Sequence, residues 1–169
     1  MSPFTRRGGD LTASFERAEA DILAQLATDV QALLSDADGV DPDSPSFRAI
    51  NRLLPAAYRD GGENDAEFHR FTSEGLIERK ARNAQAVVDV FAAGDESGKA
   101  VRVRLDAAAA QSWLRCLTDI RLTIAAGLGI EHDDDELRID GPDRSVLEVY
   151  AWVGYVQESL LHALEAHVV

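Results

Sequence analysis

The hydrophobic pattern of the chain changes its period near residue 17. Between residues 11 and 15 apolar and polar positions alternate, which is typical of a strand with one buried face. The Gly8-Gly9 pair before them suits a tight turn, so the pattern predicts a β-hairpin over residues 4–15. The spacing then becomes helical and predicts a long amphipathic helix, whose apolar stripe contains Ile22, Leu26, Val30, Leu33 and Leu34.

The middle of the chain is predicted to hold shorter helical segments separated by turns. An acidic loop with two prolines, at residues 35–45, ends the long helix. Ser44 followed by Pro45 is typical of an N-cap with proline in the first helical turn, and it predicts a short helix. Two further helical segments are expected at residues 66–72 and about 74–91.

The second half of the chain returns to the order of strand and then helix. Strict alternation predicts a strand at residues 101–105. Asp106 fits the N-cap of a second long helix, which is expected to end near Gly127 or Gly129 and to be followed by an acidic loop at 131–143. The apolar stripe of this helix contains Trp113, Leu117, Ile120 and Ile124.

A last helix is predicted after Gly141-Pro142, since proline is common in the first turn of a helix. Its apolar face contains Val146, Tyr150, Val153, Leu160 and Leu164. Gly154 lies on the same helix, where glycine costs about 1 kcal/mol relative to alanine. We therefore expect Gly154 to let a neighbouring group approach closely.

Two units of strand followed by helix match in length, one starting at Leu11 and the other at Val101. Because a lone strand leaves its edge groups unpaired, we expect the two strands to lie side by side and the two helices to pack as partners. Chance similarity between two amphipathic units stays an alternative to duplication. The predicted fold is mainly α, a helical bundle in a single domain over residues 1–169, with a small sheet formed by the hairpin and the strand at 101–105.

Composition narrows the functional classes. The 169 residues include 17 Lys and Arg against 30 Asp and Glu, and the net charge of -13 disfavours binding of nucleic acid or anionic lipid. A single Cys excludes an internal disulfide and a multi-cysteine metal site, and it fits a reducing compartment. The first residues contain no apolar signal segment and no apolar run is long enough to span a membrane, so the sequence predicts a cytoplasmic protein without a membrane partner.

Three stretches of the sequence are informative as a set. They are Arg52-Leu53-Leu54-Pro55-Ala56-Ala57-Tyr58-Arg59-Asp60, then Glu67-Phe68-His69-Arg70-Phe71-Thr72 with Lys80, Asn83 and Ala84, and Trp113-Leu114-Arg115-Cys116-Leu117-Thr118-Asp119-Ile120-Arg121-Leu122. In order and spacing the chain, from the hairpin to about Trp152, resembles an actinobacterial family of unknown function that is usually encoded beside the adaptor of the Clp protease. The resemblance implies no catalytic residues, although some members of that family are labelled transcriptional regulators.

Known catalytic and metal-binding patterns do not occur in the sequence. There is no Gly-x-Ser-x-Gly elbow, phosphate-binding loop or dinucleotide fingerprint, and the acidic runs do not have the EF-hand spacing. The run at residues 131–136 therefore fits a solvated loop, and Cys116 fits a buried small hydrophobic residue. We predict no catalytic, cofactor-binding or metal-ligating residues and no cofactor.

Two groups of residues are candidates for a site. Trp152 and Tyr155 lie away from the apolar stripe of the last helix and are candidates for a protein interface, with packing at the edge of the core as the alternative. Asp119 and Arg121 lie in the third stretch, where Arg121 is expected to pair with a carboxylate such as Glu67. That polar group serves either to fix the bundle or to bind a ligand.

The sequence favours a non-enzymatic protein-interaction or regulatory module, and the resemblance links it to Clp proteolysis. Its partner is an unknown protein, and a homo-oligomer stays open. One alternative is a transcriptional regulator, whose basic face would consist of Arg70, Arg79, Lys80 and Arg82. The other is an enzyme or ligand-binding protein that uses a pocket between helices.

Overall fold

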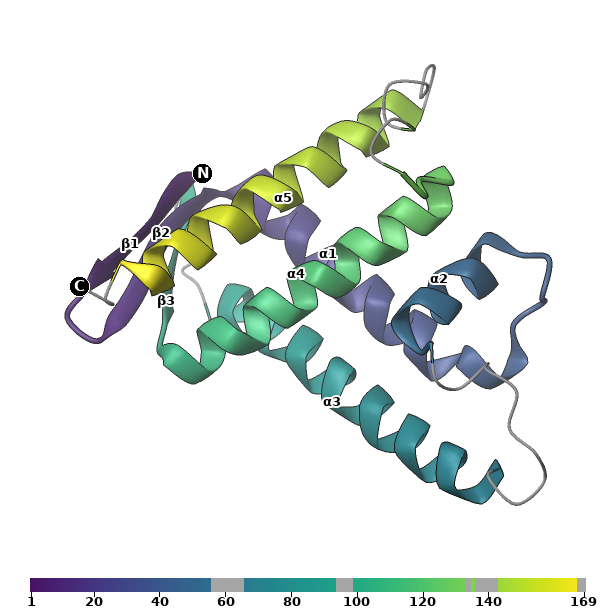
Figure 1. Ribbon diagram of the computed structural model, residues 1–169. Helices are drawn as coiled ribbons and strands as arrows, with labels where there is room; N and C mark the ends of the chain where they lie inside the picture. Colours follow the sequence, from purple (N-terminus) through teal and green to yellow (C-terminus); the bar gives the residue numbers. More distant parts are fainter. Residues whose placement is uncertain (56–65, 94–98, 133–134, 136–142, 167–169) are drawn as a thin grey trace.

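The computed structural model describes residues 1–55, 66–93, 99–132, 135 and 143–166 (Figure 1). A short 3-10 turn at Ala37–Gly39 follows the first helix. The other elements are, in chain order, β1 (Ser2–Arg7), β2 (Asp10–Glu16), α1 (Arg17–Ser35), α2 (Pro45–Leu53), α3 (Ala66–Ala92), β3 (Ala100–Leu105), α4 (Ala107–Leu128) and α5 (Asp143–Glu165). This element order confirms the prediction of a mainly α fold with a small sheet.

The sheet is antiparallel and has the strand order β1-β2-β3. Gly8 in the turn between β1 and β2 has a φ of 63°, a left-handed conformation that glycine adopts without steric cost. Leu11 of β2 lies opposite Leu105 of β3, and Ala13 lies opposite Val103, so both strands bury the same face. The predicted hairpin and the predicted pairing of the two later strands are confirmed.

Three predicted helix ends agree with the structure. The Ser44 side chain accepts a hydrogen bond from the backbone N–H three residues later at 3.1 Å, and Pro45 occupies the first position of α2. Asp106 accepts the equivalent hydrogen bond at the start of α4, at 2.8 Å. Gly129 ends α4 with a φ of 71°. The Gly141-Pro142 signal for the last helix lies outside the described residues.

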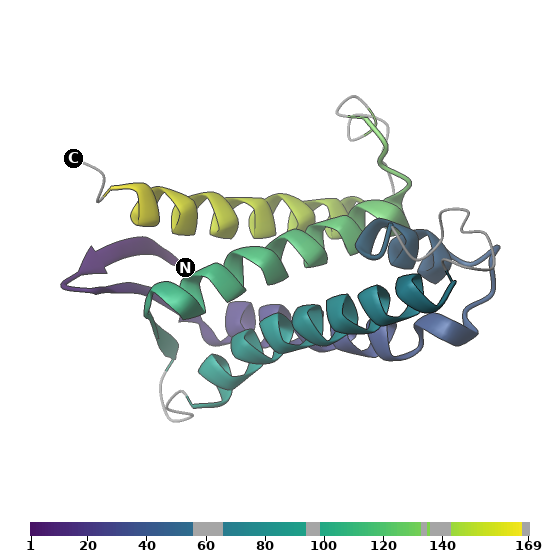
Figure 2. The ribbon, with the colours of Figure 1, turned by 60° about the horizontal axis from the view of Figure 1, so that its bottom comes forward.

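Helix α4 is the central helix of the bundle. Figure 2 shows α4 between α5 on one side and the pair α1 and α3 on the other. Helix α1 packs most closely along α3 and only lightly on α4, which corrects the expectation that α1 and α4 would be main partners. Helix α1 buries the small side chains of Ala20 and Ala27, which permit a close approach of its neighbours.

The predicted apolar stripe of α1 requires a correction. The buried positions are Ala20, Leu23, Ala27, Val30 and Leu34. Ile22 is 43% exposed instead. Each helical residue turns by about 100°, so Ile22 lies about 120° from the middle of the buried face. The sequence pattern favoured large apolar residues, whereas the helix buries alanines where other elements approach it.

Two further expectations about helices are corrected. Helix α3 is continuous from Ala66 to Ala92, and Gly75 lies inside it, where two separate segments were expected. Val146 is 41% exposed, although it was assigned to the buried face of α5. It lies in the first turn of α5, about two turns before Val153, the first buried residue of that helix.

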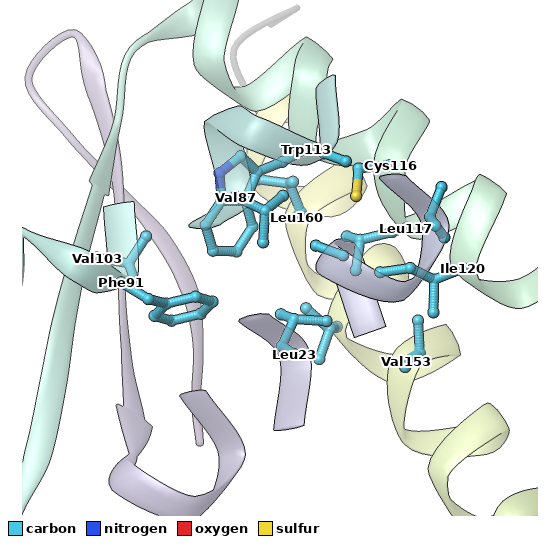
Figure 3. Close-up of a cluster of buried hydrophobic side chains, with 14 of the residues drawn as sticks. Leu23, Val87, Phe91, Val103, Trp113, Cys116, Leu117, Ile120, Val153 and Leu160 are labelled. Atoms are coloured by element: carbon cyan, nitrogen blue, oxygen red, sulfur yellow. The ribbon is translucent and has the colours of Figure 1, made fainter. Parts of the chain in front are cut away.

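One cluster of buried side chains joins the sheet to the helices. Trp113 of α4 lies at its centre, and its ring centroid is 5.3 Å from that of Phe91 and 6.1 Å from that of Phe4. The indole N–H of Trp113 donates a hydrogen bond to the carbonyl of Ala86 at 3.3 Å. Figure 3 shows Trp113 and Phe91 beside Val103 of the sheet. The core thus forms where three helices meet the inner face of the sheet.

The first strand and the last helix are in direct contact. The backbone N–H of Phe4 in β1 donates a hydrogen bond to the hydroxyl of Ser159 in α5 at 2.8 Å, across 155 positions of sequence. Since β1 is an edge strand, this bond occupies part of an edge that would otherwise be open. Among the described residues, no helix has the length and apolarity needed to cross a membrane.

Candidate functional site

A buried ion pair joins α3 to α4. The ammonium group of Lys80 lies 2.5 Å from Oδ1 of Asp119, and the side chains are 17% and 4% exposed, respectively. Lys80 was predicted to belong to a basic surface, and Asp119 to a polar group with Arg121. The packing of α3 on α4 commits Lys80 and Asp119 to each other instead.

The second carboxylate oxygen of Asp119 is buried. Among the described residues, this Oδ2 atom accepts no hydrogen bond. Burial raises the pKa of Asp119, and the hydrogen bond and charge of Lys80 oppose that rise. Asn83, one turn after Lys80 on α3, is a second buried polar residue at this place. The Oδ2 atom of Asp119 is therefore, within the described part of the chain, an unsatisfied buried acceptor, which is uncommon in folded proteins.

These side chains line a hollow between α3 and α4, which we call the α3/α4 hollow. It has a volume of about 410 Å³. Its lining residues are Leu76, Arg79, Lys80, Asn83, Arg115, Thr118 and Asp119. Arg79 and Arg115 are exposed, and within the described residues no ion pair holds either guanidinium group. Three cations and one carboxylate therefore meet in this hollow.

Cys116 lies on α4 one turn before Ile120, fully buried in the core (Figure 3). Burial raises the pKa of its thiol to about 12, and the nearby charge of Asp119 adds to the rise. At neutral pH the group is therefore a protonated thiol and not a nucleophilic thiolate. This agrees with the prediction that Cys116 is a small hydrophobic core residue.

Arg121 faces α5 and not α3. Its guanidinium group donates hydrogen bonds to Gln157 Oε1 and to the hydroxyl of Tyr150, both at 3.1 Å, and lies 4.8 Å above the Tyr150 ring. A Cβ on Gly154 would lie 3.5 Å from the Arg121 Cζ, so the close neighbour expected at Gly154 is Arg121. Gln157 in turn donates to Thr118 at 2.7 Å.

Asp119 and Arg121 thus bind different neighbours. They are two positions apart on α4, and residues at that spacing point to different sides of a helix. Asp119 faces α3, and Arg121 faces α5. Glu67 belongs to the first turn of α3, but its side chain lies outside the described residues, so its pairing with Arg121 stays a prediction.

Trp152 and Tyr155 line two different hollows on α5. Trp152 is half-buried and packs against the core, and its indole Nε1 is buried without a partner among the described residues. It lies in a hollow of about 270 Å³ between α1 and α5, which we call the α1/α5 hollow. The lining residues are Glu19, Ile22, Ser145, Glu148, Val149 and Trp152. Tyr155, which is 46% exposed, lies beside Arg121, Gly154 and Leu161 in the other hollow.

The acidic run at residues 131–136 is only partly described. Within the described part, the backbone N–H groups of Glu131 and His132 both donate to Asp135 Oδ2 at 2.9 Å, as in a capped turn. Across all the residues that the structure describes, no group of three His, Cys, Asp or Glu side chains is placed to hold a metal ion.

The Lys80–Asp119 ion pair and the burial of Asn83 beside it were not predicted from the sequence. Lys80, Asn83 and Ala84 are spaced three and four residues apart, which places them with Val87 on one face of a helix. The sequence signal for this pair was a lysine and an asparagine on the same helix face as apolar residues. From the sequence, Lys80 was grouped with Arg79 and Arg82 as a basic surface, without regard to its helical spacing to Asn83 and Val87.

Comparison with known proteins gives one family and one named relative. The model of the family described as "Domain of unknown function (DUF2017)" matches residues 1–164. The protein named "Putative oxidative stress regulator AosR" from Mycobacterium leprae (strain TN) is 26% identical over 136 residues. That match covers 74% of this chain and 60% of the relative, so the chain corresponds to less than two thirds of it. No solved structure matches the chain.

The family match runs from β1 to the last turn of α5 and includes both sides of the α3/α4 hollow and of the α1/α5 hollow. The Mycobacterium leprae relative agrees with the predicted resemblance to an actinobacterial family. This chain therefore belongs to the DUF2017 family of domains of unknown function.

Proposed function

We propose that this chain is a non-enzymatic protein-interaction module with a regulatory role, and that a protein partner docks on the α1/α5 hollow. The observation that carries the proposal is Trp152. Trp152 lines this hollow, and its indole N–H is buried and has no acceptor among the described residues. Tryptophan side chains in a surface pocket are frequent energetic centres of protein interfaces, where the indole N–H finds its acceptor.

Charge indicates what kind of segment fits this surface. Glu148 is exposed and lines the hollow, while Ile22 supplies an exposed apolar side chain on the facing part of α1. An apolar hollow beside an exposed carboxylate is complementary to a segment with apolar and basic residues, such as a basic amphipathic helix. The net charge of -13 would speed the encounter with such a partner.

The relative and the resemblance support a regulatory role. The Mycobacterium leprae protein is named as a regulator, although this chain corresponds to only 60% of its length. The resemblance described in the sequence analysis implies a gene neighbourhood with the adaptor of the Clp protease. Components of the Clp system are therefore the first partners to test.

Site-specific photo-crosslinking tests the proposal. A photo-reactive amino acid replaces Ile22 in one protein and Arg102, on the open face of the sheet, in the control. Each protein is incubated with purified Clp adaptor and protease subunits under light. We expect a crosslink to a Clp component from position 22 only. Crosslinks from both positions, or from neither, would contradict the proposed surface.

A charge variant supplies a second test that spares the core. Ile22→Arg places a cation in the hollow on an exposed position, and we expect it to weaken partner binding by about tenfold or more. Ala32→Arg, an exposed position farther along α1, is the matched control and should bind as the wild type does. Equal binding by both variants would remove the α1/α5 hollow from the interface. Crosslinks formed only between copies of this chain would show that the partner at this surface is a second copy of the chain.

The transcriptional-regulator alternative has a smaller structural basis. Lys80, one of its expected basic residues, is held by Asp119, while Arg79 and Arg82 remain exposed and the side chain of Arg70 lies outside the described residues. Binding of DNA by so few cations depends strongly on salt. A gel-shift assay at low ionic strength decides the matter, and the absence of any shifted duplex would exclude this function.

A further inference from the structure

We propose that the α3/α4 hollow binds a small organic anion, a carboxylate or a phosphate monoester, that carries a hydrogen-bond donor close to its charged group. The hollow lies between α3 and α4, whereas the proposed protein interface lies between α1 and α5. The two proposals therefore rest on different residues, and each can be refuted without affecting the other.

The surplus of positive charge selects an anion. Arg79, Lys80 and Arg115 line the hollow, and Asp119 is the single carboxylate among its described lining residues. Lys80 is bound to Asp119, while the two arginines are exposed at the rim. Guanidinium groups bind carboxylates and phosphates through paired hydrogen bonds, so the rim suits the charged end of the ligand. A divalent cation is disfavoured by the same three positive charges.

The buried carboxylate of Asp119 is the reason for a hydrogen-bond donor on the ligand. The side chain of Asp119 is 4% exposed, and its Oδ2 accepts no hydrogen bond from the described residues. A buried acceptor without a partner lowers the stability of the fold, and this cost is removed when a donor binds it. A hydroxyl or ammonium group of the ligand supplies that donor, and the Asn83 amide lies in the same hollow to orient it.

The volume of the hollow limits the ligand to a metabolite. About 410 Å³ lies in the usual range for small-molecule sites, and the walls are packed helices of the bundle. Cys116 is buried in the core, is not among the described lining residues of the hollow, and adds no reactive group, because its thiol stays protonated. The site is therefore suited to reversible binding.

Titration of isotopically labelled protein by NMR tests the proposal, with O-phospho-L-serine as the probe that contains anion and donor together. We expect saturable shifts of backbone amides around Lys80 and Asp119, with a Kd of about 1 mM or tighter. Inorganic phosphate lacks the amino group of the probe, and ethanolamine contains donor groups without an anion. Each should bind at least about tenfold more weakly at constant ionic strength.

Two variants separate the two features of the site. Arg115→Gln should weaken the probe by about tenfold, whereas Arg82→Gln, an exposed arginine of α3 outside the hollow, should leave it unchanged. Asp119→Asn should abolish the preference for phosphoserine over inorganic phosphate. Equal weakening by Arg115→Gln and Arg82→Gln, or binding of a short DNA duplex at the same amides, would overturn the proposal. So would the absence of saturable shifts up to about 10 mM probe.

Discussion

Lys80 and Asp119 compensate each other's charge at a place where both side chains are largely buried. Lys80→Met removes the cation and keeps most of the side-chain volume, so Asp119 would remain as a buried charge without compensation. We expect the free energy of unfolding to fall by about 3 kcal/mol, measured by urea denaturation. Arg82→Met, at an exposed position of the same helix, should change it by less than about 0.5 kcal/mol. Equal stability of the two variants would show that the ion pair contributes nothing.

The protonation of Asp119 couples stability to pH. Burial raises its pKa in the folded state, so ionisation of this group costs folding free energy. Its contribution is present below the unfolded pKa and is lost as the pH rises through the folded pKa. Asp119→Asn cannot ionise, and we expect the stability of the wild type relative to this variant to increase as the pH is lowered through that interval. A difference that stays constant with pH, in urea denaturation series, would contradict the raised pKa.

Cys116 reports on opening of the core. A thiol with a pKa of about 12 that is fully buried should react with a disulfide reagent only when the bundle opens. We expect no reaction of the folded protein over hours at pH 8 and rapid reaction in concentrated urea. Thr12→Cys, placed on the open face of the sheet in a Cys116→Ala background, is the reactive control. Fast labelling of native Cys116 would show that α4 is more accessible than its packing indicates.

At the scale of elements, local chemistry decided what the sequence could predict. The Ser44 and Asp106 caps, the Gly8 turn and the alternation at residues 101–105 depend on neighbouring residues, and each was predicted. The buried face of α1 depends on which helices approach it, and Ile22 was assigned wrongly for that reason. The Lys80–Asp119 pair spans 39 positions and requires the packing of α3 on α4, which no local pattern contains.

Glycines inside helices offer a test at this scale. An alanine methyl group at Gly75 of α3 would have no heavy atom of the described residues within 4 Å, whereas at Gly154 of α5 it would meet the Arg121 guanidinium at ordinary contact distance. Gly75→Ala should raise the free energy of unfolding by up to about 1 kcal/mol, because alanine favours the helix. Gly154→Ala should gain at least as much, since its methyl group also makes an ordinary van der Waals contact with Arg121. Thermal unfolding compares the two variants, and a loss of stability at Gly154 would show that Arg121 packs there too tightly for a methyl group.

For the whole molecule, the net charge of -13 acts against compactness. Repulsion among exposed carboxylates is screened by salt, so we expect the Tm to rise when NaCl is increased from about 0.02 M to about 0.3 M. Ion pairs would give the opposite trend, and the described exposed pair Arg104–Asp10 is too local to reverse it. A fall in Tm over this range, measured by calorimetry, would show that local pairs outweigh global repulsion.

The hydrogen bond from Phe4 to Ser159 has a consequence for synthesis of the chain. The ribosome adds about 5–20 residues per second, so strand β1 waits roughly 8–30 s before its partner on α5 exists. For about the first two thirds of that time the hairpin also lacks β3, and the aromatic faces of Phe4 and Phe15 have no Trp113 to cover them. The nascent chain therefore exposes the apolar face of the hairpin until β3 and α4 are made, and the edge of β1 until α5 is made, and both surfaces are prone to aggregation during synthesis.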